Sequence, residues 1–313
     1  MTSMPTDALC YRLSVQPEPT RNALLTIRLD GRGYPDGPGL EFLGGDYDLE
    51  CWSAPDDQLR VLLMSEPDDP GTDAAQSAER MYRNLIERLR DSEFGYPLRL
   101  WNYFPAINRG RGDQERYRRF CIGRGRALEA AGLEDARMCA ATAIGGHRAI
   151  MQLVALVGKK PGISIENPRQ VSAWNYPRSY GPRQPAFARA TGIRLVDDRV
   201  GLLISGTASV VGHDSAHVGD VLAQTDEAAS NLDALLAHAA AALGHPGLAR
   251  FNTNSLARVY LRHAADWPRI EQRLRKRWPE LRFCGLQGDI CRSELLIEIE
   301  AWHESPDPPE HAR

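Results

Sequence analysis

Apolar residues follow two different periods along the chain, and the alternation of these periods predicts an α+β protein. Runs of continuous or alternating apolar residues are typical of strands, and apolar residues repeated every three to four positions are typical of helices. In the first half, the pattern predicts a strand at 59–67, a helix at 73–89, a strand at 97–108, a helix at 114–130 and two strands at 136–146 and 149–158.

The second half repeats this order of elements. The pattern predicts a strand at 200–212, a helix at 220–243, a strand at 255–263, a helix at 265–278 and two strands at 281–290 and 294–303. Earlier strands at 10–18, 23–30 and 49–54 complete the first half. We therefore expect an internal duplication with domains at 1–165 and 166–313. The joining stretch 167–189, rich in Pro, Tyr and Arg, is too long for an idle linker and is expected to be functional.

Composition narrows the class of protein. No segment approaches the roughly 18 consecutive apolar residues of a spanning helix, and the N-terminus shows no secretory signal pattern. The six cysteines are scattered without a CxxC pair, which suits a reducing compartment and argues against structural zinc. The formal net charge of −3 gives no pull towards nucleic acid or anionic membrane. We expect a cytoplasmic protein that binds neither nucleic acid nor membranes, as a monomer or small homo-oligomer.

Several cofactor motifs are absent from the sequence. There is no GxxxxGK[ST] loop, no GxGxxG between a strand and a helix, and no GxSxG elbow, from which the SGTAS segment at 205–209 departs. His213 and His217 have the i,i+4 spacing of a metal pair. No further ligand set supports them, so solvated loop histidines are the expectation. The sequence therefore predicts neither a cofactor nor a metal.

The last predicted strand carries two acidic residues on one face. Leu295, Ile297 and Ile299 alternate with Leu296, Glu298 and Glu300, so one face is expected in the core and the other to hold both glutamates. A sheet with one wet face is the commoner explanation of such an alternation. The alternative is a carboxyl group that lines a cleft, where burial raises its pKa and suits it to proton transfer. Periodicity does not choose between the two glutamates.

Two pairs of phenol and guanidinium groups are candidates for binding an anion. Tyr117 and Arg124 are seven positions apart on a predicted helix and therefore share a face. Tyr176 and Arg189 form a second such pair in the joining stretch. A solvated basic face, an RNA-binding patch or a Tyr- and Pro-rich surface loop would each explain part of this pattern. Two pairs would also suit a small dianion, with each Arg clamping one carboxylate.

Several blocks of the sequence together resemble the chorismatase family. They occur in the family's order and at similar spacing, and they cover most of 101–301. The blocks are WNYFPAIN, RYRRFCIGR, ENPRQVSAWNYPRSYGP with PAFARA, ISGTASVVGH and GDICRSELLIEIE. The resemblance implies two YjgF/RidA-like units, each a mixed sheet with helices packed on one face. It also implies chorismate as the substrate, a molecule with two carboxylates, and no cofactor.

The resemblance assigns roles to individual residues. Glu298 matches the family's catalytic glutamate, which protonates the enolpyruvyl methylene. Tyr117 with Arg124, and Tyr176 with Arg189, match two substrate-binding pairs. Gly206 and Ala208 are expected on the opposite wall, where small residues allow close approach to the ring.

Cys291 matches the position at which the family divides into branches. The branch that forms 3-hydroxybenzoate, with some members also giving 4-hydroxybenzoate, carries cysteine there. The hydrolytic branch, which gives a dihydroxycyclohexadiene carboxylate, carries a small apolar residue. The cysteine therefore favours 3-hydroxybenzoate, although a buried thiol is also the ordinary state of an unpaired cysteine. The odd spacing to Glu298 requires a turn or bulge within CRSE if both side chains face one pocket.

Three other functions remain open at this stage. The first is the hydrolytic chorismatase, which differs only in product. The second is a YjgF-like imine deaminase or metabolite-binding protein, against which the NPRQVSAWNYP block speaks. The third is RNA binding through the basic stretches 109–126 and 273–277, which the net acidity disfavours.

Overall fold

The computed structural model describes residues 11–12, 41–46, 49–53, 58–133, 138–195 and 199–306. The expected strand at 23–30 lies outside these residues, and of the expected strand at 10–18 only Tyr11–Arg12 is described, as β1. All other predicted strands and helices are present, most of them with ends moved by a few residues. The α+β class and the repeated order of elements are confirmed.

The first half of the chain builds one mixed sheet with two helices on one side. Along this sheet the strands lie in the order β2-β3-β4-β7-β5-β6. Its elements are β2 (Glu41–Asp46), β3 (Leu49–Ser53), β4 (Leu59–Pro67), α1 (Ala74–Arg90), β5 (Tyr96–Pro105), the 3-10 turn η1 (Gly112–Gln114), α2 (Arg116–Ala130), β6 (Ala140–Gly146) and β7 (Ile150–Gly158). β6 is the edge strand and pairs in parallel with β5.

The second half builds a second mixed sheet, in the order β1-β14-β13-β15-β10-β9-β8. Its elements are β8 (Ile163–Ile165), β9 (Ala190–Arg194), β10 (Val200–Ala208), α3 (Val221–Leu243), β13 (Leu256–Leu261), α4 (Trp267–Arg277), β14 (Arg282–Gln287) and β15 (Ile297–Glu304). Short elements accompany them: η3 (Ala173–Asn175), η4 (Arg178–Tyr180), β11 (Val210–Val211), β12 (Asp214–Ser215), η6 (Pro246–Leu248) and η7 (Ala264–Asp266).

The chain changes sheet between β7 and β8. Ile163–Ile165 therefore belongs to the second sheet, although the expected domain boundary places it in the first domain. β1 is a second exception, because it pairs in parallel with β14. The division into domains at 1–165 and 166–313 stays a prediction.

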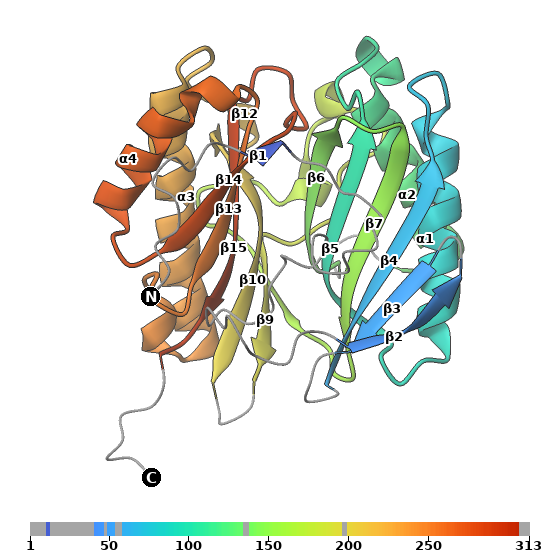
Figure 1. The fold of residues 1–313 in the computed structure, drawn as a ribbon, viewed down its shortest axis with the longest axis horizontal. Helices are drawn as coiled ribbons and strands as arrows, with labels where there is room; N and C mark the ends of the chain where they lie inside the picture. The colour runs from blue at the N-terminus through green and yellow to red at the C-terminus, as the bar shows by residue number, and fades with distance from the viewer. Residues whose placement is uncertain are drawn as a thin grey trace.

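The two sheets face each other, with the helices on the outside. Figure 1 shows α3 and α4 covering one side of the molecule and α1 and α2 the other, with both sheets between them. Alternation along β4 explains the layers: Leu62 and Met64 pack under the helices of the first half, whereas Val61 and Leu63 join a cluster between the sheets. That cluster also takes Tyr260 from the second sheet. The result is a four-layer α/β/β/α arrangement.

Side chains from the second half cover the free edge of β6. The hydroxyl of Thr191 accepts a hydrogen bond from the Ala140 backbone N–H at 2.8 Å, and the hydroxyl of Ser205 accepts one from Ala141 at 2.9 Å. Further along, the backbone N–H of Gly145 donates to the carbonyl of Asp289 at 2.7 Å. An exposed strand edge invites pairing with other chains. In this protein the hydrogen bonds along the edge of β6 join the two halves of the chain and bring β6 beside β10 and β15.

One expectation about the last strand is wrong. β15 begins at Ile297, so Leu295 lies outside the strand and packs between the two sheets. Ile297 and Ile299 face the α3 and α4 core as expected. The face that carries Glu298 and Glu300 is not wet, because the first sheet covers it and leaves these side chains 5% and 4% exposed. A second sheet packed on that face is invisible to a periodicity argument.

Candidate active site

A cavity of about 400 Å³ opens where β6 meets the second sheet. All eight residues to which the family resemblance assigns a role line it: Tyr117, Arg124, Tyr176, Arg189, Gly206, Ala208, Cys291 and Glu298. Its wall also includes Glu115, Arg118, Ala141, Thr142, Ala143, Gln170, Ser179, Tyr180, Pro185, Phe187, Val210, Arg292, Ser293, Glu294 and Leu295. The cavity is concave and mixed in polarity, and its volume suits a small metabolite.

Glu298 reaches the cavity from the second position of β15. Its register partner on β10 is Ala208. Between the pairs Ile204–Ala301 and Thr207–Ile299 the register shifts, because β10 has one residue more than β15. This bulge brings Gly206 against the glutamate: a Cβ built on Gly206 would lie 1.9 Å from Oε1 of Glu298. Only glycine allows the carboxyl group to rest there.

The environment of Glu298 favours its protonated form. Burial, and then the negative charge of Glu300, raise the pKa of the Glu298 carboxyl to about 8, against a smaller opposing effect of Arg99 and Arg189. None of the described residues donates a hydrogen bond to this carboxyl group. A carboxyl group that holds its proton near neutral pH and faces a cavity is suited to act as a general acid.

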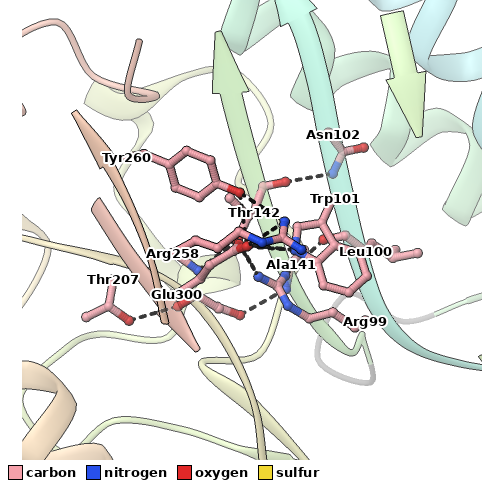
Figure 2. A network of polar contacts seen from close by, with 12 residues as sticks. Arg99, Leu100, Trp101, Asn102, Ala141, Thr142, Thr207, Arg258, Tyr260 and Glu300 are labelled. Atoms are coloured by element: carbon pink, nitrogen blue, oxygen red, sulfur yellow. Dashed lines mark hydrogen bonds and ion pairs between the residues drawn. The ribbon is translucent and has the colours of Figure 1, made fainter. Parts of the chain in front are cut away.

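Glu300 lies two positions further along the same strand and has a different environment. Its Oε1 accepts hydrogen bonds from the indole of Trp101 and the hydroxyl of Tyr260, both at 3.0 Å, and Oε2 accepts one from Thr142 at 2.6 Å. Ion pairs join it to Arg99 at 2.7 Å and Arg258 at 3.2 Å. Figure 2 shows these side chains converging on Glu300 from both sheets. The carboxylate is fully used as an acceptor in the interface between the halves.

Tyr117 and Arg124 line the cavity from α2, as their spacing predicts. Arg124 is 3% exposed, and its guanidinium carbon lies 5.2 Å from the ring centre of Phe120. Among the described residues, nothing accepts a hydrogen bond from its Nε or Nη2. A buried guanidinium with unused donors is costly unless a ligand completes it. These donors are therefore free to bind an anion.

Arg189 and Tyr176 lie on the opposite wall, in the joining stretch. Nη2 of Arg189 donates to the hydroxyl of Tyr176 and to the carbonyl of Val171, both at 2.8 Å. Its Nε has no acceptor among the described residues. The guanidinium also lies 5.1 Å from the ring centre of Phe187. The stretch expected to be functional is thus ordered against the cavity, and its Arg189 provides a second cationic group.

Cys291 lies beside the cavity in the turn that precedes β15. The turn closes with a hydrogen bond from the backbone N–H of Leu295 to the carbonyl of Arg292, at 3.1 Å. This turn brings Cys291 and Glu298 to one cavity despite their odd spacing, as required above. Burial, followed by the charge of Glu298, raises the pKa of the thiol, so it stays protonated.

Sequence reasoning missed Arg292. Its guanidinium carbon lies 4.0 Å from the ring centre of Tyr180 and 5.3 Å from that of Tyr176. Its Nη1 donates to the carbonyl of His213 at 2.9 Å and to the hydroxyl of Ser215 at 3.0 Å. Arg292 lies in a turn, where the sequence has no helical or strand periodicity. Only its place next to Cys291 in the sequence could have indicated that it lies at the cavity.

The alternative candidates for chemistry are occupied by other contacts. Nδ1 of His213 lies 3.0 Å from a carboxylate oxygen of Asp214, and Nε2 of His217 lies 3.1 Å from one of Glu227. The described residues contain no cluster of three or more His, Cys, Asp or Glu that could hold a metal ion. Several arginines of the two basic stretches are paired with acids: Arg116 with Asp68, Arg118 with Glu115, Arg119 with Asp73, Arg273 with Asp226 and Arg277 with Asp233. Within the part of the chain that the structure describes, no helix is long and apolar enough to cross a membrane.

Comparisons with known proteins identify the family of the chain. The family model "Chorismatase FkbO/Hyg5-like, N-terminal" matches residues 47–157. A 3-hydroxybenzoate synthase from Streptomyces hygroscopicus is 40% identical over 243 residues, which are 73% of this chain and 68% of that protein. A chorismatase from Streptomyces rapamycinicus is 35% identical over 268 residues, 82% of this chain and 77% of that one.

A solved structure is similar to this chain over most of its length. A chorismatase crystal structure superposes with a TM-score of 0.73 at 32% identity, covering 84% of this chain and 79% of that chain. The fold and these relatives define an enzyme that acts on a small molecule. The chain belongs to the chorismatase family.

Proposed function

We propose that this protein is a chorismatase that converts chorismate to pyruvate and 3-hydroxybenzoate, with Glu298 as the proton donor. One observation carries the proposal: a carboxyl group with a pKa of about 8 faces a cavity whose walls hold two partly unsatisfied guanidinium groups. The relatives named chorismatase and 3-hydroxybenzoate synthase support the same assignment.

The two arginines fit the two carboxylates of chorismate. Arg124 offers Nε and Nη2 from α2, and Arg189 offers Nε from the joining stretch. Guanidinium groups bind carboxylates with planar, charge-assisted hydrogen bonds. Tyr117 and Tyr176 line the cavity beside their arginines and complete the two binding pairs. Gly206 and Ala208 form the wall against which the ring lies.

Protonation of the enol ether starts the reaction. Glu298 transfers its proton to the terminal methylene of the enolpyruvyl group, which becomes a methyl group and leaves an oxocarbenium-like cation. The carboxylate that remains stabilises this cation electrostatically. Pyruvate and 3-hydroxybenzoate together have the composition of chorismate. The bond between the ring and the ether oxygen then breaks and pyruvate leaves, while the oxygen of the adjacent ring hydroxyl bonds to the vacated carbon and gives its proton to the Glu298 carboxylate, which restores the acid. The resulting cyclic oxide opens at the carbon that first held the hydroxyl. The proton on the other oxide carbon moves to the oxygen as the ring aromatises to 3-hydroxybenzoate.

Cys291 supports the branch that forms a hydroxybenzoate. Its protonated thiol lies at the same cavity as the Glu298 carboxyl group. Hydrolysis of the same cation would consume one water molecule and leave a dihydroxycyclohexadiene carboxylate. The dihydroxycyclohexadiene carboxylate is therefore the alternative to 3-hydroxybenzoate as the product. 4-Hydroxybenzoate is a further product of the branch that forms 3-hydroxybenzoate.

A product assay tests the proposal. The purified protein is incubated with chorismate, pyruvate is measured with a coupled dehydrogenase, and the aromatic products are separated by chromatography. We expect pyruvate and 3-hydroxybenzoate from the wild type, and a loss of about 10²- to 10⁴-fold in turnover for Glu298→Gln, which keeps the shape without the acid. Undiminished turnover of this variant overturns the mechanism. Pyruvate without any hydroxybenzoate assigns the protein to the hydrolytic branch.

We further propose a cytoplasmic monomer or small homo-oligomer that binds neither nucleic acid nor membranes. The pairing of the basic stretches with carboxylates supports the statement on nucleic acid, because paired cations offer little net field to phosphates. Binding of mixed RNA at low salt would contradict it. Light scattering of the purified protein gives the oligomeric state.

A further inference from the structure

A chain of hydrogen bonds connects the interface network to the wall of the cavity. The hydroxyl of Thr142, on β6, donates to Oε2 of Glu300 at 2.6 Å. The hydroxyl oxygen of Thr142 also accepts a hydrogen bond from the backbone N–H of Gly206, on β10, at 2.9 Å. Arg99 donates to both Thr142 and Glu300. Figure 2 shows Thr142 and Arg99 next to Glu300. One hydroxyl therefore joins the first sheet to the bulge in the second.

The bulge is the place where this contact matters. Because the register between β10 and β15 shifts here, the backbone of Gly206 lies outside the regular ladder, and its N–H takes the Thr142 hydroxyl as acceptor. The Glu298 carboxyl lies directly on Gly206, so closely that a Cβ would occupy the position of its oxygen. A shift of the bulge therefore moves the surface on which the carboxyl group rests.

Thr142 itself is well fixed. It is 3% exposed and lines the cavity, and its hydroxyl has one acceptor and two donors around it. Glu300 orients the proton of this hydroxyl, because it accepts from it, so the lone pairs of the oxygen point to Gly206 and Arg99. Without the hydroxyl, the Gly206 N–H loses its partner in a partly buried place.

We propose that Thr142 is a positioning residue for Glu298: its hydroxyl, oriented by Glu300 and Arg99, holds the Gly206 bulge where the Glu298 carboxyl rests on it. The first half of the chain thereby sets the place of an acid that belongs to the second half. This inference deepens the proposed function and rests on it as far as turnover is concerned. The placement of the carboxyl group can be tested without a substrate.

Thr191 offers a matched control. It is 2% exposed, and its hydroxyl also accepts a backbone N–H across the two sheets, from Ala140 at 2.8 Å. It does not line the cavity. Thr142→Val and Thr191→Val each remove one buried hydroxyl that accepts a backbone N–H across the sheets, and both keep the shape of the side chain. Thr142→Val also removes the contacts of its hydroxyl with Glu300 and Arg99. Only the backbone N–H bound by Thr142 belongs to the residue on which the Glu298 carboxyl rests.

The first measurement follows Glu298 in the free protein by infrared difference titration. The carbonyl band that is present in the wild type and missing in Glu298→Gln identifies the protonated carboxyl group, with a midpoint near pH 8 expected in the wild type. Thr142→Val is expected to move this midpoint to lower pH, because a loosened bulge admits water to the carboxyl group. Thr191→Val is expected to leave it in place.

The second measurement is turnover of chorismate. Thr142→Val is expected to lower kcat by about 10²-fold, the order of loss that a misplacement of about 1 Å causes, with little change in KM. Thr142→Ser, which restores the hydroxyl, is expected to recover most of the loss, and Thr191→Val to retain the wild-type rate. If Thr142→Val does not fold by circular dichroism, Thr142→Ala takes its place.

The outcomes separate this inference from the proposed function. The inference is overturned if Thr142→Val and Thr191→Val give the same midpoint for Glu298. It is also overturned if Thr142→Ser behaves like Thr142→Val. A wild type that releases no pyruvate overturns the proposed function alone, and the titration then decides whether Thr142 places the carboxyl group.

Discussion

Glu298 and Glu300 occupy the same face of one strand, are almost equally buried, and have opposite surroundings. Glu300 receives hydrogen bonds or ion pairs from five side chains contributed by both sheets. Glu298 faces the cavity, and its pKa rises to about 8. Burial is common to both residues, so it does not explain the difference. The groups that lie opposite each carboxyl group decide it.

The comparison also shows that the two residues depend on each other. The charge of Glu300, compensated by Arg99 and Arg258, is the second cause of the raised pKa of Glu298. A fixed anion beside a second carboxyl group disfavours a second ionisation. One glutamate thus serves the interface, and its charge helps the other to keep a proton.

The largest effect is expected on stability, when Glu300 loses the charge that its two arginines compensate. Glu300→Gln leaves Arg99 and Arg258 buried without their counter-charge, and breaking a buried pair in this way costs about 3–5 kcal/mol of unfolding free energy. Urea unfolding measures this loss. The control is Glu79→Gln, which removes the more exposed pair with Arg83 and should cost less than about 1 kcal/mol. Equal losses would show that the network contributes no more than a surface pair.

The next largest effect is expected from filling the space beside Glu298. Gly206→Ala places a methyl group where the carboxyl oxygen lies, so the acid must move, and kcat is expected to fall by about 10²-fold. Gly146→Ala, in β6, is the control, because a Cβ there meets no atom within 4 Å. Full turnover of Gly206→Ala would mean that the position of the carboxyl group in the free protein is not the one used in the reaction.

The pH dependence sharpens the comparison further. Because Glu298 must be protonated to donate, kcat/KM for chorismate is expected to fall above a pH of about 8. Between its ordinary pKa of 4.5 and about 8, the folded protein keeps a proton that the unfolded chain has lost. Stability contributed by this group therefore decreases as the pH rises through that window. Glu298→Gln, which has no such group, should gain in Tm relative to the wild type from pH 5 to 8, and a constant difference would contradict the raised pKa.

The smallest effect is expected at Cys291. Cys291→Ala should leave pyruvate release nearly unchanged. It should raise the share of the dihydroxycyclohexadiene carboxylate relative to 3-hydroxybenzoate, and chromatography of the products measures this ratio. Cys284→Ala, which removes a thiol that does not line the cavity, should leave the product ratio as it is. An unchanged ratio in Cys291→Ala would mean that the thiol only fills space.

Local patterns predicted the elements and part of the site. The starts of α1 and α3 could be read from Asp73 and Asp220, whose side chains cap these helices. Tyr117 and Arg124 could be paired because helical spacing alone puts them on one face. These features depend on neighbours in the sequence, and for that reason they were predictable.

The choice between Glu298 and Glu300 could not come from local patterns. It depends on Arg99, Trp101 and Thr142, which lie more than 150 residues away in the sequence and reach Glu300 across the sheet interface. Local patterns also could not show that the first sheet covers the face of the last strand that carries Glu298 and Glu300. The resemblance to a family selected Glu298, because a family motif carries the effect of these distant contacts without showing them.

The covered edge of β6 has a consequence for how the site comes into being. Cavity walls come from α2 and β6 in the first half and from β10 and β15 in the second, and the bonds along this edge join the two halves. Without the first sheet over it, the Glu298 carboxyl group would be exposed to water and ionised at neutral pH. The contact between the two sheets therefore creates the acid itself, and a chain without this contact would carry every residue of the site without its reactivity.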